Sequence, residues 1–346
     1  MTTEAKTVRL LVNGDPHFKV NNALQTAEFT EKYIALAQRL KPDAIINLGD
    51  SLDKHRDVDI EPLTQVTECL RRLNRVAPLY ILIGNHDRIN NSDFLTGKHP
   101  FSALSEWPNA TVVDVTKTAT IKGLHFVFVP YVPPGRFQEA LSTIILPNPV
   151  RAYFAHQEFK GAKMGAIRSV VGDPWPLSEP LVVSGHIHDY DRLQGNLIYT
   201  GTPMQHAFGD TDDKTVSLFT FNVDEPGHWQ EERFDLHLRK LKLFHLSCEE
   251  VKTFTPPENT RCKIVIRGTP AEVKACMKLD HVKQLHTNGV KIVYKTLGTT
   301  QPERSPPRHD QIRPNLSFGV KLYQAAQKEP DISALYTELF GQPIQP

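Results

Sequence analysis

The chain has 346 residues, of which 40% are hydrophobic, and its formal net charge is +1. This length predicts about two domains, and the apolar content is sufficient for at least one sizeable core. The balanced charge excludes a chain that is basic or acidic throughout, but it allows a local basic surface, so a nucleic-acid partner is neither required nor excluded.

The cysteines and the apolar segments indicate the cellular compartment in which the protein is expected to act. Four cysteines, Cys69, Cys248, Cys262 and Cys276, show no C-x-x-C spacing. They are therefore expected to be reduced thiols rather than a disulfide framework or a zinc cluster. No apolar stretch is long enough for a signal peptide or a membrane span. We expect a soluble, cytoplasmic protein without a membrane partner.

The first part of the chain alternates predicted strands with predicted helices. Strands are predicted at residues 8–14, 43–49 and 79–84, where the sequence is mainly apolar. Helices are predicted at residues 23–40 and 62–76, where apolar residues recur at intervals of three or four. This strand–helix order is typical of a parallel, layered sheet.

From residue 110 onward the apolar runs are shorter and alternate with polar residues. The runs at 111–115, 118–121 and 124–129 predict antiparallel strands beside the first sheet, with a tight connection at Lys122-Gly123. A short helix at 136–142 and strands at 150–155, 181–185, 197–203 and 215–223 are predicted to follow. The fold class is therefore expected to be α/β, with a two-sheet sandwich flanked by helices.

The pattern restarts near residue 240. Strands at 240–246, 262–267 and 290–294 and a helix at 269–279 predict a small α+β cap. Segment 298–314 is dense in Pro and Arg and is typical of a linker. Short apolar helices are predicted beyond it, and they either dock on their own protein or await a partner. The domain division that we predict is 1–238, 239–297 for the cap, 298–314 for the linker and 315–346 for the C-terminal helical segment.

The residues that carry chemistry stand at the ends of the predicted strands. Because carboxyl ends of parallel strands meet at one edge of a sheet, these side chains are expected to converge. Carboxylate, imidazole and amide oxygen ligands suit divalent ions such as manganese, iron or zinc. There are more ligands than one ion can use, which indicates two ions sharing a carboxylate. The set comprises Asp15, His17, Asp50, Asn85, His86, His156, His186 and His188.

Five short motifs contain these residues, and the order of the motifs along the chain is informative. D-x-H at Asp15, G-D at Asp50, G-N-H-D at residues 84–87, the single His156 and G-H-x-H at residues 185–188 together resemble the calcineurin-like metallophosphoesterases. The resemblance covers roughly residues 8–200 and implies the metallophosphoesterase sandwich with two divalent ions, most readily Mn2+, with Mg2+, Fe2+ or Zn2+ as alternatives.

The same resemblance implies a role for each residue. One ion would be held by Asp15, His17, Asp50 and His188, and the other by Asp50, Asn85, His156 and His186. His86 would be a catalytic imidazole that steadies the transition state or protonates the leaving oxygen, and Asp87 would support it.

Residues 198–205, Ile-Tyr-Thr-Gly-Thr-Pro-Met-Gln, resemble the Y-x-G-S-P stretch of SbcD-type DNA repair nuclease subunits. The cap, linker and terminal helices also resemble that family, in which such helices grip the coiled-coil base of an SbcC-type ATPase. This resemblance implies a DNA exonuclease or endonuclease in repair, recombination or end processing, with DNA, the ATPase and a second copy of itself as partners. The compact chain fits a diverged viral or phage member, which would act in the host cell cytoplasm.

Two other functions stay open at this point. One is a metallophosphoesterase that acts on nucleotides or phosphoproteins, and the other is a scaffold that keeps the fold without the ions.

Further residues near the motifs carry weaker signals. Asp53 and His55 either contact substrate or cap the turn after Asp50. The remaining histidines singled out, His99, His125 and His206, are expected to be structural or surface residues. Candidate DNA contacts are Arg88, Lys98, Lys160 and Lys163, although each alone is more often a solvated side chain.

Overall fold

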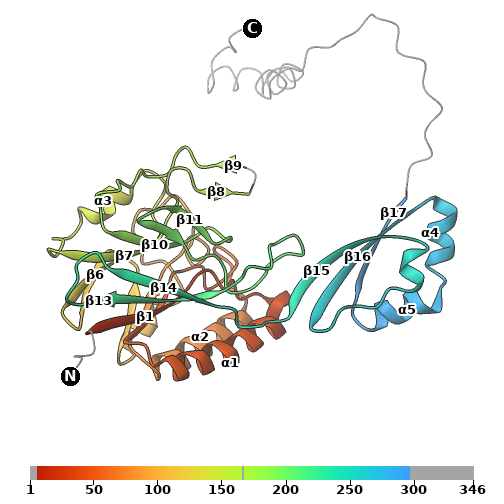
Figure 1. The fold of residues 1–346 in the computed structure, drawn as a ribbon, viewed down its shortest axis with the longest axis horizontal. Helices are drawn as coiled ribbons and strands as arrows, with labels where there is room; N and C mark the ends of the chain where they lie inside the picture. The colour runs from red at the N-terminus through yellow and green to blue at the C-terminus, as the bar shows by residue number, and fades with distance from the viewer. Residues whose placement is uncertain (1–5, 166, 297–346) are drawn as a thin grey trace, which may run out of the picture. The chain divides into compact units, whose positions relative to one another are not determined.

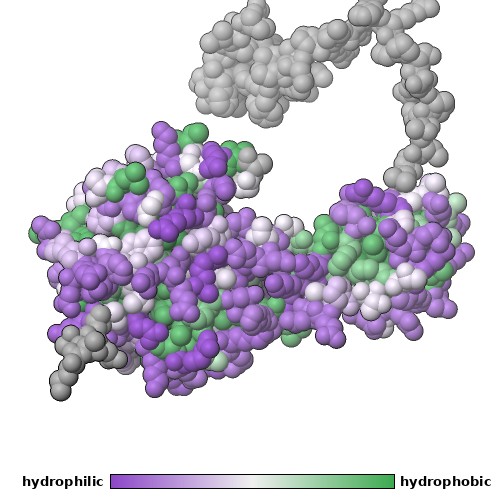
Figure 2. All heavy atoms as spheres, viewed as in Figure 1, coloured by the Kyte–Doolittle hydropathy of each residue, from purple (hydrophilic) through white to green (hydrophobic). Residues whose placement is uncertain are grey.

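The computed structural model describes residues 6–165 and 167–296 (Figure 1). The predicted linker at 298–314 and the predicted helical segment at 315–346 lie outside the described residues. Figure 2 shows hydrophilic side chains over most of the face that it views. Among the helices of the described part, none is both long and apolar enough to cross a membrane.

The first sheet has six strands and is parallel over the part that the βαβαβ pattern predicted. Helices α1 (Ala23–Leu40) and α2 (Ile60–Asn74) connect its parallel strands and run side by side on one face (Figure 1). In spatial order the strands are β14 (Trp229–Phe234), β13 (Val216–Asn222), β1 (Thr7–Asn13), β2 (Ala44–Asn47), β3 (Leu79–Leu82) and β4 (Ala110–Val113).

The second sheet also has six strands and packs against the first. The predicted hairpin around Lys122-Gly123 is confirmed, because β5 (Lys117–Ile121) and β6 (Leu124–Val129) pair in antiparallel fashion. In spatial order the strands are β11 (Asp191–Gln194), β12 (Leu197–Tyr199), β10 (Leu181–Gly185), β7 (Val150–His156), β6 (Leu124–Val129) and β5 (Lys117–Ile121). Helix α3 (Phe137–Leu141) covers its outer face.

Alternation along the strands divides the core into layers. In β1, Leu11 points to the layer under α1 and α2, where it joins Phe29 and Leu70. Val8, Leu10 and Val12 point the other way, into the layer between the two sheets. Buried on both faces, these strands have the continuous apolar sequence of central strands, and the predicted two-sheet sandwich is confirmed.

One strand direction was wrong in the prediction. The run at 111–115 was expected to be antiparallel, but β4 pairs with β3 in parallel, with Leu79 opposite Ala110. The chain between them crosses over through the 3-10 helix η2 (Ser102–Glu106), so it re-enters the sheet in the original direction. Strand periodicity indicates which face is buried and cannot distinguish the two directions.

Residues 240–296 form a separate three-stranded sheet with its own core. Its strands are all parallel, and the crossover to the last strand carries two helices, of which the second was not predicted. We keep residues 239–297 as the proposed capping domain. The elements here are β15 (Lys240–Ser247), η3 (Glu250–Lys252), β16 (Thr260–Gly268), α4 (Pro270–Cys276), α5 (Asp280–Thr287) and β17 (Lys291–Thr296). The remaining short elements of the described chain are η1 (Val20–Asn22), β8 (Lys163–Met164) and β9 (Ile167–Arg168).

Candidate metal centre

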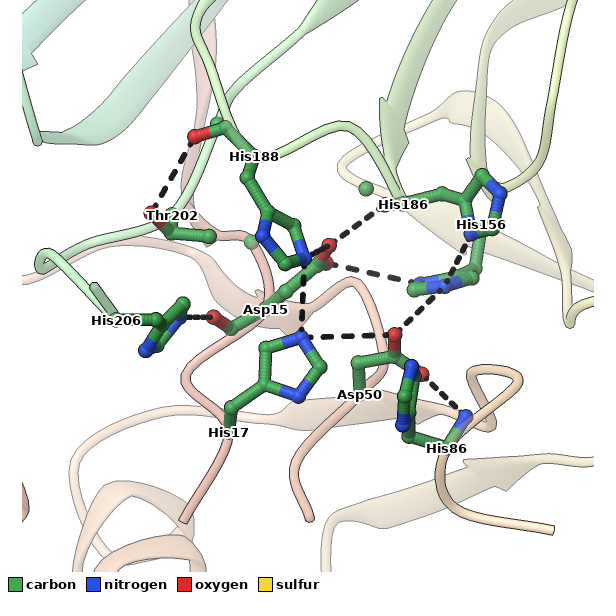
Figure 3. A network of polar contacts seen from close by, with 12 residues as sticks. Asp15, His17, Asp50, His86, His156, His186, His188, Thr202 and His206 are labelled. Carbon is green, nitrogen blue, oxygen red and sulfur yellow. Dashed lines mark hydrogen bonds and ion pairs between the residues drawn. The ribbon is translucent and has the colours of Figure 1, made fainter. Parts of the chain in front are cut away.

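The strand-end residues meet at one edge of the sandwich, where strands of both sheets end (Figure 3). Three of them, Asp15, Asp50 and His156, are at most 1% exposed. The structure thus brings together side chains that the sequence separates by more than 170 residues. Asp15 and His17 follow β1, Asp50 follows β2, Asn85 and His86 follow β3, His156 ends β7, and His186 and His188 follow β10.

Three of these residues have left-handed backbone conformations. The φ angles are 43° at His17, 45° at Asp50 and 80° at His186. For residues with a Cβ atom this region costs roughly 1–2 kcal/mol each. Hydrogen bonds between the loops stabilise this backbone conformation. His17 N donates to Asp50 O at 3.0 Å, and His186 N donates to an Asp15 carboxylate oxygen at 2.8 Å.

Glycines let these loops approach each other closely. A Cβ atom on Gly84 would lie 2.2 Å from both the backbone N and Oδ1 of Asp50. A Cβ atom on Gly185 would lie 2.5 Å from Oδ1 of Asp15. The glycine in each of these motifs is therefore explained by space for the neighbouring ligand loop.

The first cluster consists of Asp50, Asn85, His156 and His186. His156 Nδ1 donates to the carbonyl oxygen of Leu48 at 2.9 Å, which leaves a lone pair on Nε2. That Nε2 lies 2.9 Å from Asn85 Oδ1, 3.3 Å from His186 Nδ1 and 3.4 Å from Asp50 Oδ2. His186 Nδ1 is in turn 2.8 Å from Asn85 Oδ1. When both imidazoles are neutral, these four atoms carry at most one hydrogen among them, and their lone pairs form the ligand set that a cation requires.

The second cluster consists of Asp15, His17 and His188, whose ligand atoms converge. His17 Nε2 lies 3.1 Å from His188 Nε2, and His188 Nε2 lies 4.0 Å from an Asp15 oxygen. Oδ1 of Asp15 is buried and has no hydrogen-bond partner. An orphaned carboxylate oxygen beside two imidazoles fits a second cation.

Asp50 lies between the two clusters. Its Oδ2 is 3.7 Å from His17 Nε2 in one cluster and 3.4 Å from His156 Nε2 in the other. A carboxylate in this position is what two ions about 3.5–4 Å apart would share.

Burial and charge set the protonation of the cluster. Burial raises the pKa of Asp15 to about 7, whereas for Asp50 burial is outweighed by His156, which holds the pKa below its usual range. Burial lowers the pKa of His17, and it lowers that of His186 to about 3 with help from the charge of His156. Neutral imidazoles keep their lone pairs available for a metal.

His156 titrates differently from the other candidate ligands. Burial would lower its pKa, but the charges of Asp50 and Asp15 raise that pKa to about 9. Without a cation, a proton on His156 therefore neutralises part of the negative charge in the centre.

His86 lies beside the clusters with one ring nitrogen free. Its Nδ1 donates to the carbonyl oxygen of Asp53 at 2.8 Å, so Nε2 is the atom left for substrate. The hydrogen bonds of the Asp87 carboxylate go to the backbone N–H groups of Leu52 at 2.9 Å and Gly84 at 3.0 Å. Asp53 therefore orients the imidazole, and Asp87 joins two ligand loops.

Sequence reasoning underrated two histidines. His206 Nε2 donates to the carbonyl oxygen of Asp15 at 2.9 Å, and its ring lies 4.9 Å from that of His17. The ring of His55 stacks on that of His86 at 4.5 Å, with 21° between the planes. For His55 the available signal was its position five residues after Asp50, and for His206 it was the loop after β12, the strand that follows G-H-x-H. His99 and His125 pair instead with Asp114 and Thr120, away from these ligands.

One candidate DNA contact was wrong. Arg88 is 3% exposed, and its guanidinium donates to the carbonyl oxygens of Tyr131, at 2.7 Å, and Asp93. It shapes the loop instead of facing solvent. Lys98, Lys160 and Lys163 are exposed.

Comparisons with known proteins agree with this geometry. A family model described as calcineurin-like phosphoesterase matches residues 8–190. Protein 078R of Invertebrate iridescent virus 3 is 38% identical over 301 residues, which cover 85% of this chain and 86% of that protein. Protein 244L of Invertebrate iridescent virus 6 is 40% identical over 279 residues, which cover 78% of this chain and 97% of that protein. Both are named as candidate phosphoesterases.

A solved structure of an archaeal phosphodiesterase aligns with 66% of this chain and 100% of its own, at 16% identity and a TM-score of 0.34. That similarity is too low to carry an argument about substrate.

Proposed function

We propose a function from one premise: this chain belongs to the calcineurin-like phosphoesterase family, and it is therefore a metal-dependent phosphoester hydrolase. Within that family, we propose that it is a DNA phosphodiesterase of the SbcD type. The observation that carries the proposal is the pair of acceptor clusters joined by Asp50, with the free nitrogen of His86 beside them.

The ligand set fits two divalent ions, with manganese as the proposed native metal. Asp15, His17 and His188 would hold one ion, His156, His186 and Asn85 the other, and Asp50 both. Such ions, when bound, supply an activated water and positive charge for the phosphoryl oxygens.

The protein's own contribution to the reaction centres on His86. The carbonyl of Asp53 fixes its ring, so Nε2 can carry a proton toward the leaving oxygen of the ester. Burial of Asp50 and Asp15 excludes bulk water from the anionic side of the centre, whereas the side chain of His188 is 46% exposed. Substrate would therefore enter from the side of His188.

Two features favour DNA as the substrate. Residues 198–205 resemble the SbcD stretch that follows G-H-x-H, and their tail, Gln205, is hydrogen-bonded through Oε1 and Nε2 to the backbone of Leu241 in β15. A small parallel sheet follows the sandwich, as expected for the capping domain of that family. Homodimerisation and an SbcC-type ATPase partner are parts of the same proposal.

The test is hydrolysis of end-labelled duplex and single-stranded DNA, with bis(p-nitrophenyl) phosphate as a small reference ester, in several divalent ions. We expect manganese-dependent cleavage of DNA by the wild type. His86→Ala should lower kcat by about 10²–10⁴-fold, and metal content, measured by elemental analysis, should be unchanged. Rapid hydrolysis of small esters without any cleavage of DNA would contradict the nuclease.

That outcome would support the alternative, a phosphoesterase acting on nucleotides or phosphoproteins. The names of the two viral relatives fit this alternative as well as they fit the nuclease, because both names specify a phosphoesterase and neither mentions a nucleic acid.

The partner proposal has its own experiment. Deleting residues 315–346 should abolish association with a coiled-coil ATPase and leave basal cleavage intact. Loss of folding on deletion, detected by circular dichroism, would show that the segment packs on its own protein. Light scattering of the full chain measures the homodimer.

A further inference from the structure

A hairpin projects from the edge of the sandwich that carries the metal centre, and it has no role in the proposed chemistry. This basic hairpin, residues 159–165 and 167–172, contains β8 and β9 and projects from the second sheet (Figure 1). Its stem is fixed, because Gly161 N donates to Ser169 O at 2.8 Å and Lys160 N donates to Asp173 O at 3.0 Å. Phe159 at its base is fully buried, and its N–H donates to the hydroxyl of Tyr199 at 2.9 Å.

The basic hairpin lies beside two ligand loops. It begins three residues after His156, the ligand at the end of β7. Its other neighbour is the segment that follows His188, since the Lys163 ammonium lies 4.0 Å from a carboxylate oxygen of Asp191. A molecule bound at the metal centre and extending along the sheet edge would therefore meet this hairpin.

The composition of the hairpin indicates the chemistry of such a molecule. It carries three cations, Lys160, Lys163 and Arg168, and no acidic residue, in a chain whose net charge is only +1. All three are exposed. Arg168 donates one hydrogen bond to the carbonyl oxygen of Gly161 at 3.0 Å, which leaves further N–H groups for a ligand. Exposed cations on a fixed stem suit a polyanion.

Apolar side chains accompany the cations. Ile167 is 72% exposed and Val170 is 80% exposed, and hydrophobic and hydrophilic residues are interleaved where the hairpin projects (Figure 2). Exposed apolar residues next to cations can pack on sugars and bases while the cations pair with phosphates.

We propose that the basic hairpin binds the sugar–phosphate backbone of DNA whose scissile bond lies at the metal centre. The proposal rests on the proposed nuclease function and adds a second contact to it, outside the reacting atoms. A second copy of this chain is a poorer occupant, because a twofold contact centred on the hairpin would place two identical cationic hairpins against each other.

The test compares two triple variants with the same change of charge. The first is Lys160→Ala, Lys163→Ala and Arg168→Ala. The control is Lys6→Ala, Arg39→Ala and Arg75→Ala, which are exposed residues just before β1 and at the C-terminal ends of α1 and α2, on the opposite edge of the sheet. Binding of labelled duplex is measured against salt concentration in the His86→Ala background. Hydrolysis of bis(p-nitrophenyl) phosphate is measured in the wild-type background.

We expect the hairpin variant to bind DNA roughly tenfold more weakly or worse, and the slope of log affinity against log salt to fall by about 0.9 for each lost phosphate contact. The control variant should keep both quantities, and both variants should keep hydrolysis of the small ester. Unchanged DNA binding in the hairpin variant, or equal losses in both variants, would overturn the proposal.

Other outcomes separate this proposal from the nuclease itself. If the wild type cleaves DNA and the hairpin variant binds it equally well, the hairpin proposal alone fails. If the protein hydrolyses the small ester but binds no DNA at all, both proposals fail. A change from dimer to monomer in Ile167→Ser with Val170→Ser, with DNA binding intact, would make the hairpin an interface between copies and overturn its assignment to DNA.

Discussion

The metal centre and the sheet of residues 240–296 place their left-handed residues very differently. At the metal centre these residues are His17, Asp50 and His186, whose Cβ atoms make this region cost roughly 1–2 kcal/mol each, although Asp and His enter it more often than most residues. In the small sheet they are Asn259 and Gly289, which adopt it readily. The small sheet is thus locally consistent, whereas the metal centre is held by contacts between loops. The left-handed residues of the metal centre therefore depend on contacts between loops, as expected where the chemistry of a site determines the residue types.

The comparison is tested most severely by removing one carboxylate from each region. Asp50→Ala should lose hydrolysis on the order of 10³-fold, because a metal ion contributes several kcal/mol to transition-state stabilisation. Asp280→Ala, in α5, removes an exposed carboxylate paired with Lys283 at 2.9 Å and should leave the rate unchanged. Steady-state kinetics and elemental analysis measure both. A fully active Asp50→Ala protein would refute the two-ion centre.

Removal of the metal ions by a chelator should affect the metal centre but not the small sheet. An ion present at 100 times its Kd stabilises the native state by about 2.7 kcal/mol. We expect removal of metal to increase amide hydrogen exchange in segments 13–17, 47–50 and 84–88 and to leave segment 260–268 unaffected. The Asp50→Ala protein provides the control, since chelation should change little there. Equal loss of protection in both regions would show that the ions stabilise the whole chain.

Glycine substitution tests the spacing of the ligand loops. Gly84→Ala places a methyl group against Asp50 and should weaken metal affinity by roughly 10–100-fold, the usual effect of disturbing the support of a ligand. Gly289→Ala, where φ is +84° and nothing lies within 4 Å, should lower stability but not metal affinity. Isothermal titration with manganese and thermal denaturation measure the two effects. Unchanged metal affinity in Gly84→Ala would show that metal binding does not depend on the space that Gly84 leaves for the Asp50 loop.

The smallest effect is expected at a helix cap. Thr269 accepts a hydrogen bond from Glu272 N at the start of α4, and Thr269→Ala should lower the free energy of unfolding by about 1 kcal/mol. Hydrolysis should be unchanged. A loss of activity in this variant, measured as the rate of hydrolysis, would mean that the small sheet is coupled to the metal centre.

Much of the sandwich could be predicted because its local signals are strong. The predicted helix at residues 23–40 matches α1, since Phe29 and Tyr33 recur with helical spacing and both are buried. The convergence of the candidate ligands could be predicted because each member stands within a few residues of a strand end, and parallel strands bring such ends together.

Other features depend on contacts that no local pattern encodes. His206 reaches Asp15 across 191 positions of the chain. Arg88 follows a ligand motif as a substrate contact would, yet the carbonyl of Tyr131 fixes it inside the protein. The direction of β4 depends on the path of its connection. In each case tertiary packing determines the outcome, and the local sequence pattern does not show it.

The left-handed backbone at His17, Asp50 and His186 has an evolutionary consequence. Glycine at each of these positions would relieve roughly 1 kcal/mol of strain. In a lineage without selection for catalysis, glycine at these sites would therefore be favoured, and the protein would gain stability while it lost activity. Degenerate descendants should be recognisable by intact strands that end in glycine where a histidine or an aspartate once stood.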